Sequence, residues 1–432
     1  MEETTVGSYF VSNYPPYSFW SPKYVQQAQE ALNRPPAPGT PLGVYLHIPF
    51  CRKRCTFCYF KVYTDKNASE IKQYLDAAIT EQELFAQRAF IGGRKPDFIY
   101  FGGGTPSYIS SEQLSYLVNG MKRALPWDAA KEVAFECEPG TLSEDKLNVI
   151  KEMGTTRLSL GVENFDEEIL RNNGRAHGAK EISRAYDYAR KIGFPQINID
   201  LISGMVGETE ENWRENIRQL IDLAPEMVTI YQMEIPHNTV IFKEMKALGK
   251  SVAPVAGWKT KRGWVLYAFE ELEKAGYTIT SATTAAKDPE KNRFRYREYL
   301  WTGADMIGLG VASFSHVGGT HFQNESSFEA YVGRLAQGEI PIYRALTPNH
   351  EERMIREFIL QMKFGGVRPT YFAQKFGLDV RQRFAEQLEN LRRQGLLEPS
   401  DAEIRLTREG LMRVDELLHD FFLPQHREAM LV

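Results

Sequence analysis

The sequence predicts an α/β fold: an open, partial (β/α)6 barrel with an aromatic N-terminal arm and a winged-helix-like helical cap at the C-terminus. Two observations predict the barrel. Six short apolar runs alternate with amphipathic stretches between residues 43 and 276, which is typical of a parallel sheet covered by helices. These runs end near glycine or acidic residues, and in barrels the functional groups gather at that end of the strands.

Residues 1–42 form the predicted arm. They are rich in proline and aromatic residues, and most of the segment has no regular period, although residues 21–32 are compatible with a short helix. The prolines between 35 and 41 predict an extended linker. We expect the arm to lie across the main body, where it either covers a functional site or only pads the surface.

The barrel is predicted over residues 43–345. Its six strands are the apolar runs Val44–Phe50, Phe98–Gly102, Glu132–Glu136, Arg157–Val162, Ile197–Ile202 and Met227–Met233. Apolar residues between 71 and 85 share one helical face, and Ser110 with Gln113 predicts a capping box at the start of the next helix. Further strand-like runs follow at Tyr277–Ser281, Arg293–Trp301 and Met306–Phe314.

Residues 346–432 form the predicted cap. Its elements are the helices Glu351–Met362, Tyr371–Phe376 and Arg381–Gln394, the short strand Ile404–Leu406 and the helix Arg408–Phe421. This order is typical of a winged helix, a fold that often binds DNA. Acidic residues slightly outnumber basic ones in this segment, however, so we expect a cap on the barrel rather than a DNA-binding domain.

Composition indicates an ordinary globular protein. The formal net charge of −4 gives no support for binding nucleic acid or an anionic membrane, and no apolar run is long enough to span a bilayer. We identify no signal peptide. Because the four cysteines are few and mostly clustered, rather than spread out as disulfide staples, we expect a cytoplasmic protein.

Cys51, Cys55 and Cys58 follow the first predicted strand directly. Three thiolates at this spacing can hold three irons of a [4Fe–4S] cluster and leave the fourth iron open for a reacting ligand, which predicts a redox enzyme. A zinc site that also uses His47 is the alternative. Cys137 lies within an apolar run, where we expect it only to pack.

The sequence around the cysteines reads Tyr45-Leu-His-Ile-Pro-Phe-Cys51-Arg-Lys-Arg-Cys55-Thr-Phe-Cys58. It resembles the signature of the radical S-adenosylmethionine (radical SAM) superfamily, and more narrowly the branch that contains oxygen-independent coproporphyrinogen III dehydrogenase. The resemblance extends over nearly the whole chain. It includes Phe101-Gly-Gly-Gly-Thr-Pro106 after the second strand and Asn198-Ile-Asp-Leu-Ile-Ser-Gly204 around the fifth.

This resemblance implies a radical SAM barrel that binds a [4Fe–4S] cluster and S-adenosylmethionine. The open iron chelates the methionyl group, and one electron, supplied by a flavodoxin or ferredoxin partner, cleaves the sulfonium bond to release a 5′-deoxyadenosyl radical. The substrate is expected to be a small molecule. Glycines after the second strand would let the backbone approach the methionyl group.

The resemblance also implies the residues that contact S-adenosylmethionine. Arg175 matches an arginine that holds the methionyl carboxylate, Glu136 a carboxylate near the amine or ribose, and Asp200 a contact to adenosine. Tyr45 matches a tyrosine near the sulfonium. The full expected set is Tyr45, Gly103, Gly104, Thr105, Glu136, Glu163, Arg175, Asp200 and Ile202, and the candidate catalytic residues among them are Tyr45 and Glu163.

Three departures from the family pattern bear on the substrate. Glu163 stands where the relatives usually carry Gln, and Phe60 stands where the dehydrogenase often has a further Cys. A related haem chaperone has a candidate axial His where this chain has Tyr296. His316 and His321 would serve either a substrate site or a solvated loop.

Three functions therefore remain open. The first is oxidative decarboxylation of porphyrinogen propionates, with Arg293, Arg295 and Arg297 as anchors that alternate to one side of a strand-like stretch. The second is radical methyl or methylene transfer, which would use two molecules of S-adenosylmethionine. The third is non-enzymatic haem binding or delivery.

Overall fold

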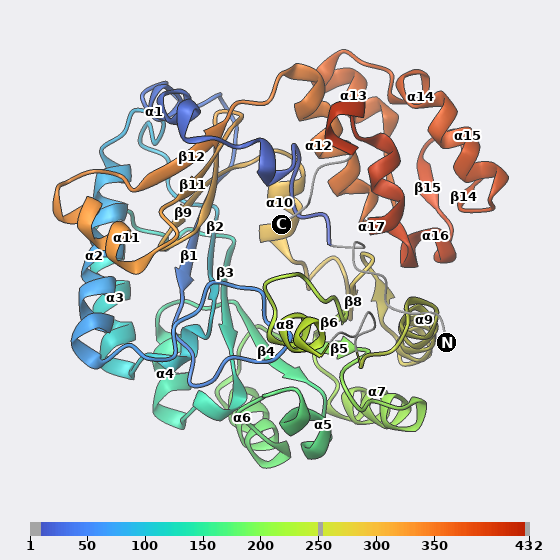
Figure 1. The fold of residues 1–432 in the computed structure, drawn as a ribbon, viewed down its shortest axis with the longest axis horizontal. Coiled ribbons are helices and arrows are strands. Elements are labelled where there is room, and N and C mark those ends of the chain that lie inside the picture. Colours follow the sequence, from blue (N-terminus) through green and yellow to red (C-terminus); the bar gives the residue numbers. More distant parts are fainter. Residues whose placement is uncertain (1–9, 249–253, 428–432) are drawn as a thin grey trace.

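The computed structural model describes residues 10–248 and 254–427 (Figure 1). A twelve-stranded sheet runs in the order β12-β11-β10-β9-β1-β2-β3-β4-β5-β6-β8-β7, and all neighbours from β9 to β6 are parallel. Among the described residues no pairing joins the two ends of this order, so the barrel is open, as the sequence predicts. β9 adds a parallel strand beyond the six that the sequence predicts.

The barrel strands lie close to their predicted positions. Their bounds are β1 Leu42–Ile48, β2 Phe98–Gly103, β3 Glu132–Cys137, β4 Arg157–Glu163, β5 Gln196–Ser203, β6 Met227–Gln232, β7 Thr278–Ile279, β8 Thr284–Ala286, β9 Asp305–Leu309, β10 Phe314–Val317, β11 Thr320–Asn324 and β12 Ile342–Leu346. Helices cover the outer face of the sheet (Figure 1): α2 Ala68–Ala86, α3 Ser111–Ala124, α4 Glu144–Glu152, α5 Glu167–Asn172, α6 Ala179–Ile192, α7 Glu210–Leu223 and α9 Trp258–Lys274. The remaining helices of this part are α8 Val240–Ala247, α10 Arg295–Trp301 and α11 Phe328–Ala336.

Of the three predictions for residues 277–314, one is wrong and two are correct only in part. The stretch Arg293–Trp301 is largely helix α10, because the carboxylate of Glu132 accepts the backbone N–H groups of Arg295 (3.0 Å) and Tyr296 (2.9 Å) and so caps the helix from another strand. The run at 306–314 is divided between β9 and β10 by a turn with Gly310 at φ +99°. The run at 277–281 contributes only the two-residue edge strand β7.

The cap contains the predicted elements, two more strands and a short final helix. Its elements are α12 His350–Met362, β13 Gly366–Val367, α13 Pro369–Phe376, α14 Val380–Arg383, α15 Ala385–Arg393, β14 Leu397–Glu398, β15 Ile404–Leu406, α16 Arg408–Met412, α17 Val414–Leu417, the 3-10 turn Leu418–Phe421 and α18 Pro424–Arg427. The short strands form a separate sheet in the order β13-β15-β14. The helices predicted at 381–394 and 408–421 are each broken, at Phe384 and Arg413.

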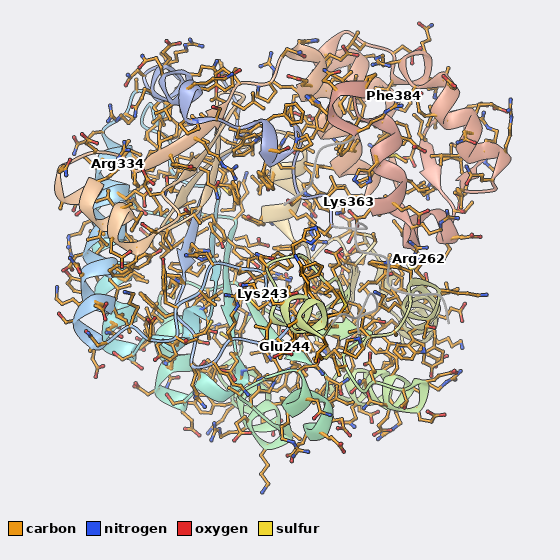
Figure 2. All side chains as sticks on the ribbon, viewed as in Figure 1. Lys243, Glu244, Arg262, Arg334, Lys363 and Phe384 are labelled. Atoms are coloured by element: carbon orange, nitrogen blue, oxygen red, sulfur yellow. The ribbon has the colours of Figure 1, made fainter. Side chains whose placement is uncertain are left out.

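The arm fastens the cap to the barrel, and its predicted helix is α1 Val25–Leu32. The first nine residues of the predicted arm lie outside the described residues. The backbone N–H of Val11 donates to Asp415 (2.8 Å), and the hydroxyl of Tyr14 contacts His426 Nδ1 (2.7 Å). Nζ of Lys363, a residue labelled in Figure 2, donates to the carbonyl of Val11 (3.0 Å) and to the carboxylate of Asp415 (2.7 Å).

The two faces of the parallel sheet differ in chemistry. On β1, Val44 and Leu46 belong to the large apolar core shared with the outer helices, whereas Tyr45 faces the other way. The same alternation on the other strands turns polar and aromatic side chains toward the concave inner face. Among the described residues, no helix has both the length and the apolar content that a membrane span requires.

Candidate functional site

The cysteine segment, residues 51–58, leaves the end of β1 and is held by backbone hydrogen bonds. The N–H of Cys51 donates to the carbonyl of Tyr63 (3.0 Å), and that of Thr56 donates to the carbonyl of Asn173 (3.1 Å). Cys51 is buried, while Cys55 and Cys58 are partly exposed, and all three are free thiols. The segment is therefore fixed to two parts of the barrel rim.

Two polar groups point at the sulfurs. The hydroxyl of Thr105 donates to Cys51 Sγ (3.3 Å), and Nη1 of Arg175 donates to Cys55 Sγ (3.4 Å). Both contacts favour the thiolate form. Burial acts in the opposite direction and raises the pKa of Cys51 to about 12 and that of Cys58 to about 11, so stable thiolates here require a cationic partner such as iron.

The described residues suit a cluster better than a single zinc ion. No group of three or more described His, Cys, Asp or Glu side chains converges on one metal position. A zinc ion needs its ligands about 2.0–2.3 Å from one centre, whereas each thiolate of an iron–sulfur cluster binds a different iron. Both ring nitrogens of His47 are already engaged, by Tyr45 Oη (3.1 Å) and by the carbonyl of Lys61 (3.0 Å), which disfavours the zinc alternative.

The glycine-rich turn after β2 lies directly against the cysteine segment. A Cβ on Gly104 would come within 2.9 Å of the Pro49 carbonyl carbon and 3.0 Å of Cys51 Sγ. Gly103 adopts φ +113°, and a Cβ there would lie 2.6 Å from the ring of His47. Both positions require glycine because neighbouring atoms come too close for a side chain. The two glycines and the three thiols together form a site, here called the cradle, whose donor set fits a cluster.

Arg175 connects the cysteine segment to the ends of the strands. Its Nη2 donates to the carbonyl of Gly161 (2.6 Å) and lies 3.6 Å from a carboxylate oxygen of Glu163. Its Nε is buried and has no partner, so this side chain retains a free donor. Glu163 occupies an irregularity in β4 with φ +66°, a strained conformation for a non-glycine residue that turns its carboxylate toward Arg175.

Two further carboxylates line the inner face beside Glu163. Tyr100 donates a short hydrogen bond to Glu136, and Asp200 accepts from Ser159 (2.8 Å) and Asn198 (2.9 Å). Burial raises the pKa of Glu136 to about 7, and it raises that of Asp200 as well.

The pKa of Glu163 is likewise raised to about 7, because burial outweighs the attraction of Arg175. Each of these three carboxyl groups is thus placed where it gains from a cationic or hydrogen-bond-donating ligand.

The other predicted site residues lie on the same inner face or next to it. Tyr45 stacks on Tyr100, with ring centroids 5.9 Å apart, and a Cβ on Gly102 would meet both Tyr45 and Glu136 at 3.1 Å. Ile202 belongs to a small apolar cluster that packs against Phe57 of the cysteine segment. The structure therefore brings the predicted residues together around the cysteine segment and the adjoining ends of β2–β5.

The two histidines are not part of this assembly. His316 and His321 face each other across β10 and β11, with their Nδ1 atoms 3.0 Å apart, and the ring of His321 stacks on Trp20 of the arm. Both are buried, so the solvated loop considered from the sequence is incorrect. Cys137 is buried in the main core, as predicted.

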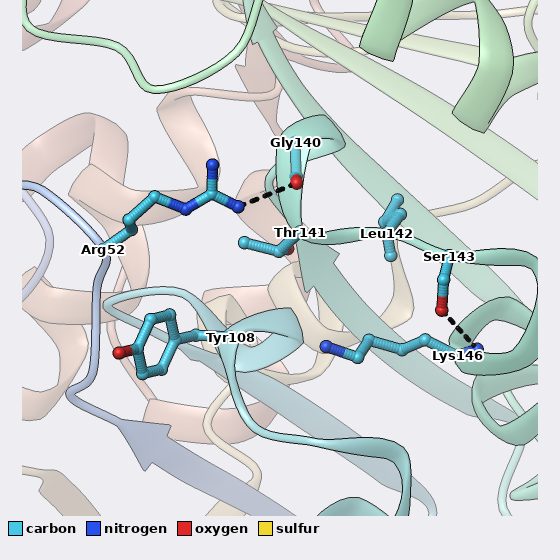
Figure 3. A pocket seen from close by; sticks show the side chains of 7 residues that line it. All are labelled: Arg52, Tyr108, Gly140, Thr141, Leu142, Ser143 and Lys146. Atoms are coloured by element: carbon cyan, nitrogen blue, oxygen red, sulfur yellow. Dashed lines mark hydrogen bonds between the residues drawn. The ribbon is translucent and has the colours of Figure 1, made fainter. Parts of the chain in front are cut away.

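A pocket of about 290 Å3 lies beside the cysteine segment, outside the barrel (Figure 3). It is lined by Arg52, Tyr108, Gly140, Thr141, Leu142, Ser143 and Lys146. Its two cations are held by carbonyl groups, since Arg52 donates to Gly140 (2.9 Å, dashed in Figure 3) and Lys146 Nζ donates to Ser107 (2.6 Å). This pocket gives the outer side of the cysteine segment a basic character.

The inner face has a cationic part that the sequence predicts only in part. Arg297 is an expected anchor, but it turns inward from α10 and not from a strand, whereas Arg157, which opens β4 and is almost fully buried, is not among the expected residues. The signal available for Arg157 is a charged residue at the start of an otherwise apolar strand. The helix α10 is capped by Glu132, a residue far away in the chain, so the residues around 295 do not predict this contact.

Comparison with known proteins identifies the family. Residues 45–220 match the radical SAM superfamily, and residues 349–413 match the HemN C-terminal domain. The heme chaperone HemW of Bacillus subtilis (strain 168) is 30% identical over 381 residues, which cover 88% of this chain and 98% of the relative. The oxygen-independent coproporphyrinogen III oxidase of Escherichia coli (strain K12) is 26% identical over 392 residues, 87% and 84% of the two chains.

The solved structure of coproporphyrinogen III oxidase (HemN) from Escherichia coli, a radical SAM enzyme, shares this fold. It superposes with a TM-score of 0.81 at 24% identity and covers 95% of this chain and 96% of that one. Cysteine segment, parallel sheet and C-terminal cap therefore occur together in the order that the family requires. The chain belongs to the radical SAM superfamily, in the HemN-like branch.

Proposed function

We propose that this protein is an enzyme that cleaves S-adenosylmethionine reductively and uses the resulting radical on a small-molecule substrate. Proteins of this family use a [4Fe–4S] cluster and S-adenosylmethionine. The observation that carries the proposal is the position of Arg175, which contacts Cys55, Gly161 and Glu163 at once. One cation thus spans the gap between the thiol segment and the carboxylates of the strand ends.

Cys51, Cys55 and Cys58 would hold the cluster, which supplies one electron to the sulfonium bond when S-adenosylmethionine is bound. Arg175 retains a buried free Nε, so it can orient the methionyl carboxylate without releasing Gly161.

The carboxylates and the turn would position the rest of S-adenosylmethionine. In this proposal Glu136 would accept from the methionyl amine, and Asp200 and Glu163 would accept from ribose hydroxyls. Gly103, Gly104 and Thr105 would bring backbone and hydroxyl groups close to the methionyl chain, with Tyr45 and Ile202 on either side. Most of these groups are partly exposed in the structure, so bound S-adenosylmethionine and substrate would themselves complete the exclusion of water that a reactive radical requires.

For the reaction itself we propose oxidative decarboxylation of a porphyrinogen-type propionate. The support is twofold: curated relatives covering most of the chain are coproporphyrinogen oxidases, and the inner face carries buried arginines suited to carboxylates. Of the three arginines expected as anchors, only Arg297 is buried on the inner face. Arg293 is instead paired with Glu298 on the surface (2.7 Å), and Arg295 begins α10.

Haem delivery is the second candidate, because the HemW relative is named a heme chaperone. Tyr296, at the position of the candidate axial ligand, is packed against Tyr100 (ring centroids 4.4 Å) and Phe294 (5.8 Å). Since His316 and His321 are buried under the arm, neither offers an open coordination site. These contacts favour the enzymatic proposal.

The electron donor would dock on the outer side of the cysteine segment. In and just after the cysteine segment the exposed cations are Arg52, Lys53 and Lys61, and the exposed rings are those of Tyr59 (42%) and Phe60 (48%). On a chain with net charge −4 such a basic patch suits an acidic flavodoxin or ferredoxin. We expect Lys53→Glu to slow cluster reduction by flavodoxin but not by dithionite, as measured by stopped-flow absorbance, and equal slowing by both would remove the docking role.

The test of the main proposal is anaerobic reconstitution followed by product analysis. The wild type is expected to bind iron and sulfide and to form 5′-deoxyadenosine from S-adenosylmethionine and dithionite. Cys55→Ala should lose both, whereas Cys137→Ala, a cysteine in the core, should retain both. A wild type without iron or 5′-deoxyadenosine would refute the proposal.

The reaction class is read from the other products. Carbon dioxide release from coproporphyrinogen III indicates decarboxylation, and S-adenosylhomocysteine indicates methyl transfer with a second S-adenosylmethionine. Stoichiometric haem binding without 5′-deoxyadenosine would indicate a delivery protein instead.

A further inference from the structure

The inner face of the barrel holds two arginines with no ion partner. Arg157 is 2% exposed and Arg297 is 7% exposed. Among the described residues, no carboxylate oxygen lies within 4.0 Å of a guanidinium nitrogen of Arg157 or Arg297, the distance that defines an ion pair. Burying an unpaired charge is costly, and folded proteins rarely leave one without a compensating anion.

The neighbouring carboxylates are engaged elsewhere. Glu132 accepts the two backbone N–H groups that begin α10, Glu136 accepts from Tyr100, and Asp200 accepts from Ser159 and Asn198. These acids lower the electrostatic cost of the arginines but do not fill their donor positions.

The donors of Arg157 are open. Its Nε and Nη1 are buried and make no hydrogen bond, whereas Nη1 of Arg297 donates only to the neutral hydroxyls of Ser281 (3.0 Å) and Thr283 (3.2 Å). No hydrogen bond from Nη2 of Arg157 is found among the described residues either, and a free guanidinium binds a carboxylate through two parallel hydrogen bonds, from Nε with Nη2 or from Nη1 with Nη2. The missing partner therefore has the shape and charge of a carboxylate.

An aromatic residue aligns the two cations. The guanidinium carbons of Arg157 and Arg297 lie 4.1 Å and 4.8 Å from the ring centroid of Phe294. That ring is 6.0 Å from Tyr100, which in turn stacks on Tyr45. The arginines thus border a continuous aromatic surface that suits a flat, apolar molecule bearing an acidic group.

The pair also lies at a defined depth. Arg157 on β4 lies opposite Ala134 on β3. Two residues further along these strands, Ser159 on β4 lies opposite Glu136 on β3. Two residues of strand correspond to about 7 Å, so the pair is set deeper in the barrel than the proposed contacts of S-adenosylmethionine. An acid bound there would hold the body of the substrate against Tyr45 and Tyr100, between the arginines and the cysteine segment.

We propose that Arg157 and Arg297 form the carboxylate anchor of the substrate, which is a flat organic acid held with its acidic group at the inner end of the barrel. This inference rests on the proposed function and specifies the substrate-binding residues within it. Arg157 supplies the bidentate contact, Arg297 adds the second positive charge, and Phe294 fixes the planes of both.

Equilibrium dialysis of cluster-loaded protein with coproporphyrin III and with its tetramethyl ester tests the anchor. The ester has the same ring but no anionic carboxylate. The wild type is expected to bind the acid at least tenfold more tightly than the ester. Arg157→Gln should weaken binding of the acid by about tenfold to a hundredfold and leave ester binding unchanged. Arg214→Gln, on the exposed face of α7, is the matched control and should change neither.

Stability separates an anchor from a structural role. Arg157→Gln removes a buried charge that has no ion partner but also the contact of the guanidinium with Phe294, so the urea midpoint of unfolding is expected to stay close to the wild-type value, whereas removal of a structural arginine would lower it strongly. Iron content and affinity for S-adenosylmethionine should stay at wild-type values, so failure of the cluster chemistry would be seen separately. Equal affinity for acid and ester, no binding of the acid by the wild type, unchanged acid affinity in Arg157→Gln, or a strongly lowered midpoint would each overturn the proposal.

Discussion

Gly104 offers the most direct test of the cradle around the thiols. A methyl group added at this position would lie 3.0 Å from both Cys51 Sγ and the carbonyl oxygen of Ile48, and 2.9 Å from the carbonyl carbon of Pro49. The nearest atoms belong to the backbone or to the short, buried side chain of Cys51, so no flexible side chain can swing away. Substitution by Ala therefore forces either the strand end or the sulfur to move.

The required movement exceeds what a metal site tolerates. Ordinary contact begins at 3.4 Å, so the sulfur or the turn must shift by roughly 0.4 Å, about twice the 0.2 Å tolerance of metal–ligand distances. Overpacking of this kind usually costs about 1–3 kcal/mol. Gly104→Ala is thus expected to lower the stability of the metal-free protein by about 2 kcal/mol and to reduce the iron bound per chain.

Iron analysis after anaerobic reconstitution and urea unfolding of metal-free protein measure the two effects. Gly263→Ala is the control, because this helical glycine in α9 has open space around its Cβ position and should gain about 1 kcal/mol from the better helix former. If Gly104→Ala kept full iron and wild-type stability, the turn would not be pressed against the thiol, and the cradle described above would be incorrect.

Three further predictions concern single hydrogen bonds and one titration. Thr105→Val removes the donor to Cys51 Sγ and should lower the cluster midpoint potential by about 40 mV, equivalent to about 1 kcal/mol, in a redox titration; an unchanged potential would exclude the contact. Tyr14→Phe removes a buried partner of His426 and should cost about 1 kcal/mol on unfolding, and no loss would show that the arm is not fastened there. Burial lowers the pKa of His47 to about 4 from about 6.5 in the unfolded chain. The stability that the neutral His47 ring contributes to the fold is therefore fully present above pH 6.5 and is lost as the pH falls toward 4. Urea unfolding of wild type and His47→Asn at pH 7.5 and pH 5 should show a loss of stability that is about 2 kcal/mol smaller in the variant, and an equal loss in both would contradict the burial of a neutral His47.

Much of the barrel could be predicted because each of its strands is a short apolar run that can be recognised from neighbouring residues. Apolar runs such as that in β5 are buried on the helix side, and the acidic residue within it, Asp200, marks the inner face. The cysteine segment and the glycine-rich turn could also be predicted, since both are short motifs whose spacing indicates one local geometry. These features depend on residues close to one another in the chain.

The features that could not be predicted depend on contacts between residues far apart in the chain. The alternating arginines before Trp301 suggested a strand, yet Glu132, about 160 residues away along the chain, caps the segment as a helix. The importance of Arg157 follows from what is missing around it, namely a partner for Nε and Nη1, and only the folded arrangement shows that. Similarly, the burial of His321 depends on Trp20 of the arm, which reaches it across the fold.

The contacts of the arm set an order of assembly. Val11 and Asp415 are separated by 404 residues, and Tyr14 and His426 by 412, so these bonds can form only after the cap has folded. Until then Val11 and Tyr14 have no partners for these bonds. Tyr17 and Trp20 differ in this respect, because they pack on Phe314 and His321 of the barrel. Folding of the cap therefore completes the attachment of an arm that the barrel already holds in part.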